Sequence, residues 1–84
     1  ITHLFTELLE QQFPIDSPRH QLSLKTPAQF AGQLSIHVNH LNRAIKETTG
    51  KTTGELISGR IAKEAKALLE HTHWNIAEIA WCLG

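Results

Sequence analysis

The 84 residues form at most one small domain, and a chain of this length buries only about two-thirds of its unfolded surface, so its margin of stability is thin. Eight basic residues balance eight acidic ones, which excludes the strongly basic composition typical of nucleic-acid binders. The lone Cys82 excludes an internal disulfide, no apolar run approaches the ~20 residues that span a membrane, and nothing resembles a signal peptide. We therefore expect a cytoplasmic protein without contact to membranes.

The first part of the chain predicts an amphipathic helix followed by a loop. Over residues 1–13 the apolar side chains recur on one side of a helix: Leu4, Phe5, Leu8, Leu9 and Phe13. The dipeptide Phe13-Pro14 ends this helix, because a residue before proline is pushed out of helical geometry. Residues 14–25 lack periodicity and predict a loop, with a short turn at Ser17-Pro18.

A helix with a clear start signal is predicted next. Thr26 and Gln29 have the spacing of a capping box, and Pro27 suits the first helical position, so the helix runs from Pro27 to about Leu34. The following three residues, 35–37, are long enough only for a tight turn, in which Ser35 or His37 caps the next helix. Two short helices joined in this way form a helix-turn-helix unit over residues 27–49.

The helix predicted over residues 38–49 has two unlike faces. Val38, Leu41, Ile45 and Thr48 form an apolar stripe, whereas the other side carries Asn39, Asn42, Arg43 and Lys46. In the DNA major groove, amides pair with adenine edges, arginine pairs with guanine, and lysine neutralises phosphates. Between Ser35 and Lys66 six basic residues stand against three acidic ones, so this part of the chain carries a mild excess of positive charge. An ordinary solvated helix face explains these four residues equally well when they are taken alone.

The rest of the chain predicts two further helices. Gly50 ends the preceding helix, and Thr52 with Glu55 has capping-box spacing. The helix over residues 52–71 has an apolar stripe, formed by Leu56, Ile57, Ile61, Ala65, Leu68 and Leu69. Its outer side carries the basic residues Arg60, Lys63 and Lys66. A last helix starts at Asn75 and turns Ile76, Ile79, Ala80 and Leu83 inward, while Trp74 and Trp81 pack in the core. With five helices and no alternating segment, the fold class is all-α.

Catalytic and metal sites find little support in the sequence. Cys82 lies among apolar residues and is expected to be a buried small side chain, and the scattered glycines form no nucleotide-binding loop. Four imidazoles, those of His37, His40, His71 and His73, could in principle meet a zinc ion, but no other ligand joins them at a recognised spacing. We therefore expect no enzyme, no metal and no cofactor, and keep a histidine metal site only as a third hypothesis.

In combination, these motifs resemble the DNA-binding domain of AraC-type (AraC/XylS) transcription regulators. The resemblance rests on residues 31–43 (AGQLSIHVNHLNR), 46–52 (KETTGKT), Arg60-Ile61 with Glu64-Ala65-Lys66 and Leu68-Leu69, and Trp74 to Ala80 with Leu83-Gly84. It implies two homeodomain-like helix-turn-helix units joined by a linker helix. Residues 1–13 would be a scaffold helix, 27–49 the first unit, 52–71 the linker helix and 75–84 the start of the second unit.

The family resemblance also implies roles for single residues. Asn39, Asn42 and Arg43 would face base edges of double-stranded DNA, and the backbone contacts would come from His37, Lys46, Thr52 and Thr53. His37 would occupy the capping position before the recognition helix, residues 38–49, where serine is commoner in the family. The exposed N–H groups at the start of the linker helix would suit a phosphate.

The same resemblance implies that the chain ends inside the second unit, without the second recognition helix. We therefore expect weak DNA binding by this fragment, self-association through the apolar surface at that end, and RNA polymerase as a further partner of the full-length bacterial protein. A helical protein-interaction module that does not bind DNA is the competing hypothesis.

Overall fold

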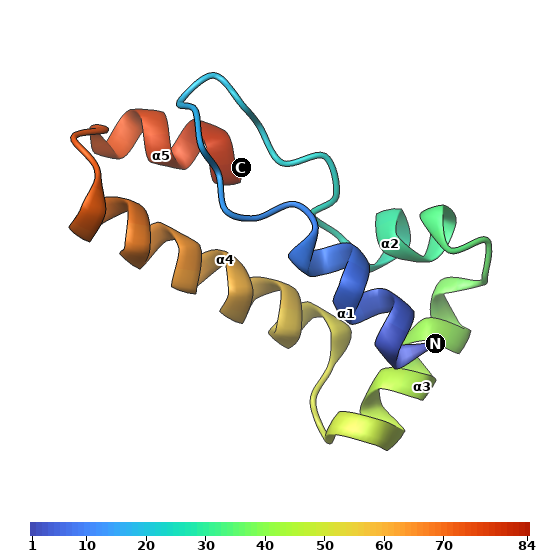
Figure 1. Ribbon diagram of the computed structural model, residues 1–84. Helices are drawn as coiled ribbons and strands as arrows, with labels where there is room; N and C mark the ends of the chain where they lie inside the picture. Colours follow the sequence, from blue (N-terminus) through green and yellow to red (C-terminus); the bar gives the residue numbers. More distant parts are fainter.

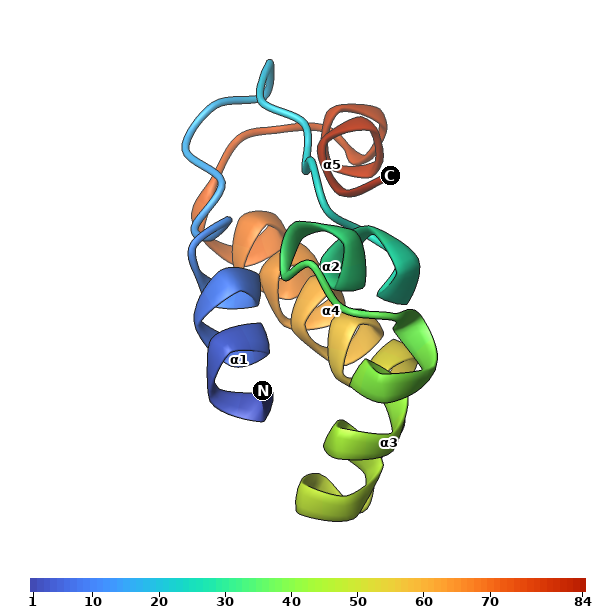
Figure 2. The ribbon, with the colours of Figure 1, turned by 90° about the vertical axis from the view of Figure 1, so that its right-hand side faces the viewer.

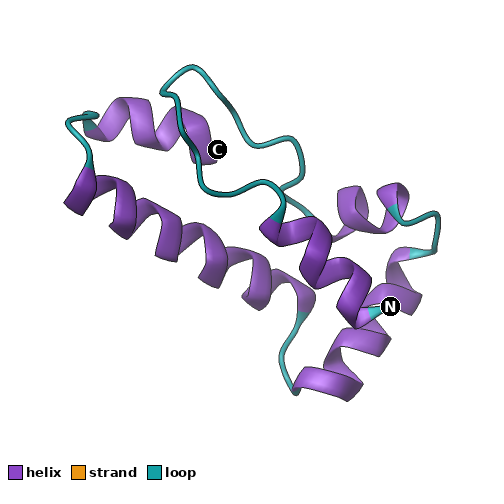
Figure 3. Cartoon of the chain, in the orientation of Figure 1, coloured by secondary structure: helices purple, strands orange, loops and turns teal.

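Five α-helices and no strand make up the computed structural model, which describes all residues 1–84 (Figure 1 and Figure 3). The helices are α1 (Thr2–Glu10), α2 (Pro27–Gln33), α3 (Val38–Thr49), α4 (Thr53–His71) and α5 (Ile76–Leu83). The radius of gyration is 13.5 Å, against about 12 Å for a compact chain of this length, and the molecule measures 40 × 22 × 17 Å. The predicted all-α class is confirmed, in an elongated molecule. None of the helices is long and apolar enough to cross a membrane.

Local capping signals set the starts of three helices. In each capping box the side chain of the cap accepts from the third helical N–H, and the third side chain accepts from the N–H of the cap. The pairs are Thr26 with Gln29, Thr52 with Glu55, and Asn75 with Glu78, all as predicted. Because these bonds involve residues three apart, the sequence alone contains the information needed to place them.

The turn between α2 and α3 is built on a left-handed residue that is not glycine. Ser35 has φ +59°, its N–H donates to the carbonyl of Gly32 at 3.2 Å, and the N–H of Ile36 donates to the carbonyl of Ala31 at 3.0 Å. These two bonds form a Schellman motif, which satisfies the last carbonyls of α2. Ser35 therefore ends α2, and His37 is the residue that caps α3.

Two groups of buried side chains lie at opposite ends of the long helix α4. In Figure 2, α5 and the loop lie above α4, and α3 lies below it. The first cluster joins α1, α2, α3 and the start of α4, and consists of Phe5, Leu9, Phe30, Ala31, Leu41, Ile45 and Ile57. In it the rings of Phe5 and Phe30 meet edge to face, with centroids 5.0 Å apart. The second cluster joins the loop, the end of α4 and α5, and consists of Ile15, Leu22, Leu68, Ile79, Cys82 and Leu83.

The loop over residues 11–26 leaves α1, passes over the end of α5 and returns to α2 (Figure 1). The N–H of Leu22 donates to the carbonyl of Cys82 at 2.9 Å, so the loop satisfies part of the C-terminal end of α5. The side-chain amide of Gln12 pairs with both backbone groups of Leu24, at 2.8 and 2.9 Å, and closes the loop at its base. The loop was predicted, but its contribution to the core was not.

The prediction of which side chains of α5 face inward was wrong in part. Ile76 is 76% exposed, Trp81 is 51% exposed and Ala80 is exposed, although all three were expected in the core. Ile79, Leu83 and Cys82 are buried as expected, and the half-buried Trp74 packs against the second cluster. Because α5 has α4 and the loop on one side only, the opposite side of the helix has no neighbour to cover it.

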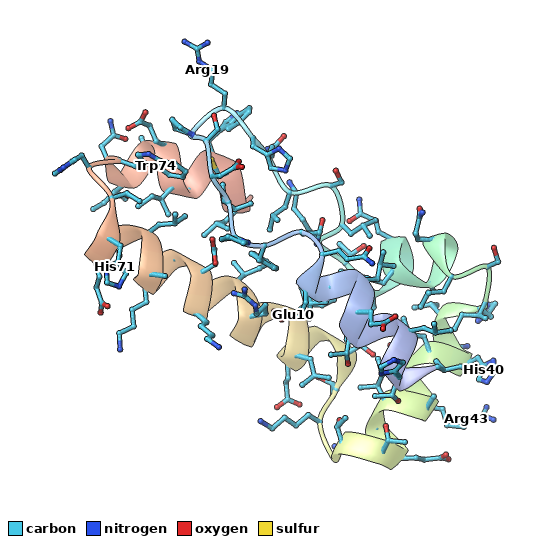
Figure 4. All side chains as sticks on the ribbon, viewed as in Figure 1. Glu10, Arg19, His40, Arg43, His71 and Trp74 are labelled. Carbon is cyan, nitrogen blue, oxygen red and sulfur yellow. The ribbon has the colours of Figure 1, made fainter.

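Two more apolar side chains, Leu4 and Leu69, were expected to face inward and lie exposed. Arg60 departs in the opposite direction, since it was expected on the outer side of its helix and its side chain is only 16% exposed. Its Nε donates to Glu10 at 2.8 Å, and its guanidinium lies 4.0 Å from the centre of the Phe13 ring. The end of α1, where Glu10 lies, is next to α4 (Figure 4), and the contacts with Glu10 and Phe13 enclose the arginine.

Candidate nucleic-acid interface

Helix α3 is fixed to the molecule by one side only. Leu41 and Ile45 are completely buried in the first cluster, and Val38 packs beside them. The Nδ1 of His37 accepts the N–H of Asn39 at 3.1 Å at the start of the helix, and Gly50 closes it with φ +76°. Thr48, expected on the apolar stripe, is exposed, and its hydroxyl lies 2.7 Å from the hydroxyl of Thr2 at the end of the stripe.

The opposite side of α3 is polar and open to solvent. Asn39, Asn42, Arg43 and Lys46 are all exposed, and they occupy the positions that the helical period predicted. The side chains of Asn39 and Arg43 form no hydrogen bond or ion pair within the chain, so their donors are free for a ligand. Figure 4 shows Arg43 and the neighbouring His40 pointing away from the rest of the molecule.

A hollow of about 440 Å³ separates this side of α3 from the first turn of α4. No apolar residue lines it, and its walls are Asn42, Arg43, Lys46, Thr52, Thr53 and Gly54. Thr52 caps α4 by accepting the N–H of Glu55 at 3.1 Å, while the N–H of Gly54 has no partner in the chain. Two cations and the positive end of a helix therefore border one hollow lined by polar residues, and this arrangement of charge is suited to an anion.

Thr53 requires a correction among the residues expected to contact the DNA backbone. It is 1% exposed, and its hydroxyl donates to the Oδ1 of Asn42 at 2.8 Å. A side chain enclosed in this way cannot reach a phosphate, so any contact at this residue would have to come from the backbone N–H groups at the start of the helix, which stays a prediction. The contact with Asn42 was not foreseen. Gly54 was missed, and the signal for it is its place as the second residue after the cap, where N–H groups lack helical partners.

Of the other expected backbone contacts, Lys46 and His37 keep free groups, whereas the backbone N–H of Thr52 is bonded within its own cap. Lys46 is exposed, and its Nζ also donates to the carbonyl of Gly50 at 3.0 Å, next to the end of α3. His37 uses Nδ1 in the cap and leaves Nε2 unbonded. The backbone N–H of Thr52 donates to the carboxylate of Glu55 at 3.1 Å and lowers the pKa of Glu55, with the Thr52 side chain as the second cause. Glu55 is thus held in its charged form by its own cap.

The structure assembles neither a metal site nor a reactive cysteine. Nowhere do three His, Cys, Asp or Glu side chains come together around a position that could hold a metal ion, so the imidazoles considered above do not converge. Burial raises the pKa of the Cys82 thiol, with the charge of Glu78 as a smaller cause. The thiol is fully buried beneath the loop and is disfavoured as a nucleophile.

No family model, curated protein or solved structure matches this chain. The resemblance to AraC-type regulators therefore depends on the motifs quoted above. The candidate interface itself is defined by the exposed side of α3 and the polar hollow beside it.

Proposed function

We propose that the chain is a DNA-binding domain of a bacterial AraC-type transcription regulator, in which α2, the turn and α3 act as a helix-turn-helix unit. The observation that carries the proposal is the exposed side of α3, where Asn39 and Arg43 have no partners inside the chain. Side chains of these types, presented by a helix anchored on its other side, match the donors and acceptors of base edges in the major groove.

The polar hollow supports the same proposal. Lys46 and the free N–H of Gly54 lie beside Arg43 and Asn42, so a phosphate of the DNA backbone would be held next to the bases that α3 contacts. In this arrangement Lys46 and Thr52 position the helix, and Asn39, Asn42 and Arg43 discriminate between bases. The proposed function requires no cofactor and no catalysis. The overall charge of zero matters little, because a backbone contact depends on the charge around the helix.

Salt dependence of binding tests the proposal. A fluorescent duplex of mixed sequence, titrated with the 84-residue chain, should show a rise in anisotropy at about 50 mM salt that weakens steeply towards about 200 mM. The matched control is Lys66→Ala, which removes an exposed cation on the far part of α4 and should leave binding unchanged. Absence of any binding at the lower salt concentration would reject DNA binding by this chain.

A protein-interaction module remains the second candidate, and the outer side of α5 favours it. Ile76 and Trp81 are two large apolar side chains on one helix, and both are exposed. Neighbouring exposed apolar side chains are typical of surfaces that contact another protein. The substitutions Ile76→Ser and Trp81→Ser would weaken a protein contact there and leave the binding of DNA to α3 intact. The duplex titration should therefore give the same binding curve for these two variants as for the native chain.

A further inference from the structure

We propose that Asn42 acts as a hydrogen-bond donor that recognises guanine, because the buried hydroxyl of Thr53 holds its amide in one orientation. The inference rests on the proposed DNA-binding function and adds a specificity to it. Thr53 is the first residue of α4, and its hydroxyl lies 2.8 Å from the Oδ1 of Asn42 on α3. This contact crosses from the recognition helix to the next helix, over the turn at Gly50.

The hydroxyl proton of Thr53 determines which end of the amide faces inward. Thr53 is 1% exposed, so its proton cannot be given to water and requires an acceptor within the protein. The Oδ1 of Asn42 is the acceptor that it meets, and no other bond of this hydroxyl exists in the structure. With the reverse orientation, the NH₂ group would face the hydroxyl and leave a buried proton without an acceptor. The NH₂ group therefore turns to the open side of α3.

A fixed amide offers a different chemistry from a free one. A free asparagine pairs with adenine through both ends, since Oδ1 accepts from N6 and Nδ2 donates to N7. Here the Oδ1 of Asn42 accepts the Thr53 hydroxyl, so the two protons of Nδ2 are the groups we expect Asn42 to present to the hollow that it lines. Guanine presents two neighbouring acceptors, N7 and O6, to the two protons of Nδ2. Adenine presents one acceptor, N7, beside an NH₂ group that opposes another donor, and cytosine presents only an NH₂ group. Asn42 was expected to face a base edge of unspecified kind, and its fixed amide favours guanine there.

Thr53 is in this scheme a positioning residue, and its substitution tests the scheme directly. Thr53→Val keeps the shape and removes the hydroxyl, so the amide of Asn42 can turn over; Thr53→Ser keeps the hydroxyl. Asn42→Asp keeps an acceptor for Thr53 and removes the NH₂ group. The probe is a pool of duplexes of about 20 base pairs with a randomised centre, from which bound molecules are separated and sequenced.

The chain itself should enrich guanine at one position, and Asn42→Asp should lose that enrichment. Thr53→Val should shift the same position from guanine towards adenine by about tenfold in relative enrichment, and Thr53→Ser should keep guanine. A loss of folding would lower enrichment at every position and could not produce this exchange. Adenine at the position that depends on Asn42, or an unchanged guanine preference in Thr53→Val, would overturn the inference and leave the proposed function standing.

A measurement without DNA separates the two proposals further. In a double-mutant cycle of urea unfolding, Asn42→Ala and Thr53→Val should be coupled by about fivefold in the unfolding equilibrium constant, because each removes the same hydrogen bond. Additive effects would show that the hydroxyl does not hold the amide, and would overturn the inference whatever the DNA experiment gives. If coupling is found and the duplex pool shows no enrichment, the proposed function fails and takes the guanine preference with it.

Discussion

The carboxylate of Glu64 accepts the backbone N–H of Ile15 at 2.8 Å, 49 residues earlier in the chain. Its other oxygen lies 3.4 Å from the Nη1 of Arg60, which also binds Glu10. One buried acid on α4 therefore holds the start of the loop and orients an arginine against α1. It is the connection through which the central helix fixes the segment that covers α5.

Removal of the Glu64 carboxylate should destabilise the protein strongly. Glu64→Ala leaves the N–H of Ile15 and one side of Arg60 without a partner in a buried place, and should lower the free energy of unfolding by about 3 kcal/mol. Glu64→Gln still offers an acceptor to Ile15 and should cost about 1 kcal/mol. Urea denaturation followed by circular dichroism measures both. Glu47→Ala, at an exposed unpaired acid, is the control, and equal losses for Ala and Gln at position 64 would contradict the assigned bond.

The cap of α4 should depend on pH. The Thr52 N–H, followed by the Thr52 side chain, lowers the pKa of Glu55 from its ordinary value of 4.5. The folded state thus favours the charged carboxylate, so this stabilisation is present above pH 4.5 and disappears as the pH falls through the lowered pKa. Glu55→Gln keeps a hydrogen-bond acceptor that does not titrate. As the pH falls, the free energy of unfolding of the variant should therefore rise relative to that of the native chain. A difference between the two that stays constant from neutral pH to about pH 3 would refute this.

Cys82 should be protected from alkylation. Its thiol is buried and its pKa is raised, so the reactive thiolate is scarce in the folded chain. Labelling with iodoacetamide at neutral pH should be about a hundredfold slower, or slower still, than in denaturant, and should follow the opening of the loop over α5. Gln12→Ala, which removes the two bonds at the base of the loop, should accelerate labelling. Fast labelling of the native protein would place the thiol at the surface.

Ser35→Gly should stabilise the turn between α2 and α3. Ser35 holds φ +59°, a conformation that costs an L-residue about 1 kcal/mol and costs glycine little. After the greater unfolded-state freedom of glycine is counted, a net gain of about 0.5 kcal/mol is expected. Ser58→Gly, in the middle of α4, is a control of opposite sign and should lower the thermal midpoint. A lower midpoint for Ser35→Gly would contradict the left-handed turn.

Arg43 and Lys46 should differ in how they affect DNA binding. On a preferred duplex Arg43→Ala should cost about 1–3 kcal/mol and relax the preference at one base pair. Lys46→Ala should weaken binding to all sequences alike and lower the salt slope by about one. Anisotropy titrations with preferred and scrambled duplexes at two salt concentrations distinguish these patterns. Equal losses on every sequence for Arg43→Ala would remove it from the base-contacting group.

Features that depend on neighbours in sequence were predictable. The three capping boxes, the glycine end of α3 and the two faces of α3 each follow from residues within one or two turns of one another. For the same reason Asn39, Arg43 and Lys46 lie exposed on one side, as the helical period indicated. These predictions needed no knowledge of the tertiary fold.

Features that depend on distant partners were not predictable. Periodicity finds a stripe on a helix, but it does not say whether another helix lies there, so Ile76 and Trp81 were misplaced. Arg60 was assigned to the outside because the charge suggested it, although α1 brings Glu10 and Phe13 to that place. Thr53 was assigned to phosphate because it starts a helix, and its burial arises from the way the turn at Gly50 folds α4 back onto Asn42.

The two core clusters have a consequence for cooperativity. Only Phe13 and Ile61, both half-buried, pack against both of them, so the interior is narrow at this point of α4. The end that carries α5 and the loop can then open as a separate foldon while α3 stays folded. Native-state hydrogen exchange would distinguish the two ends by different opening free energies. Ile61→Ala removes a contact that joins the two clusters, so it should make the unfolding of the two ends still more independent. A ligand bound at one end could then stay bound while the other end unfolds.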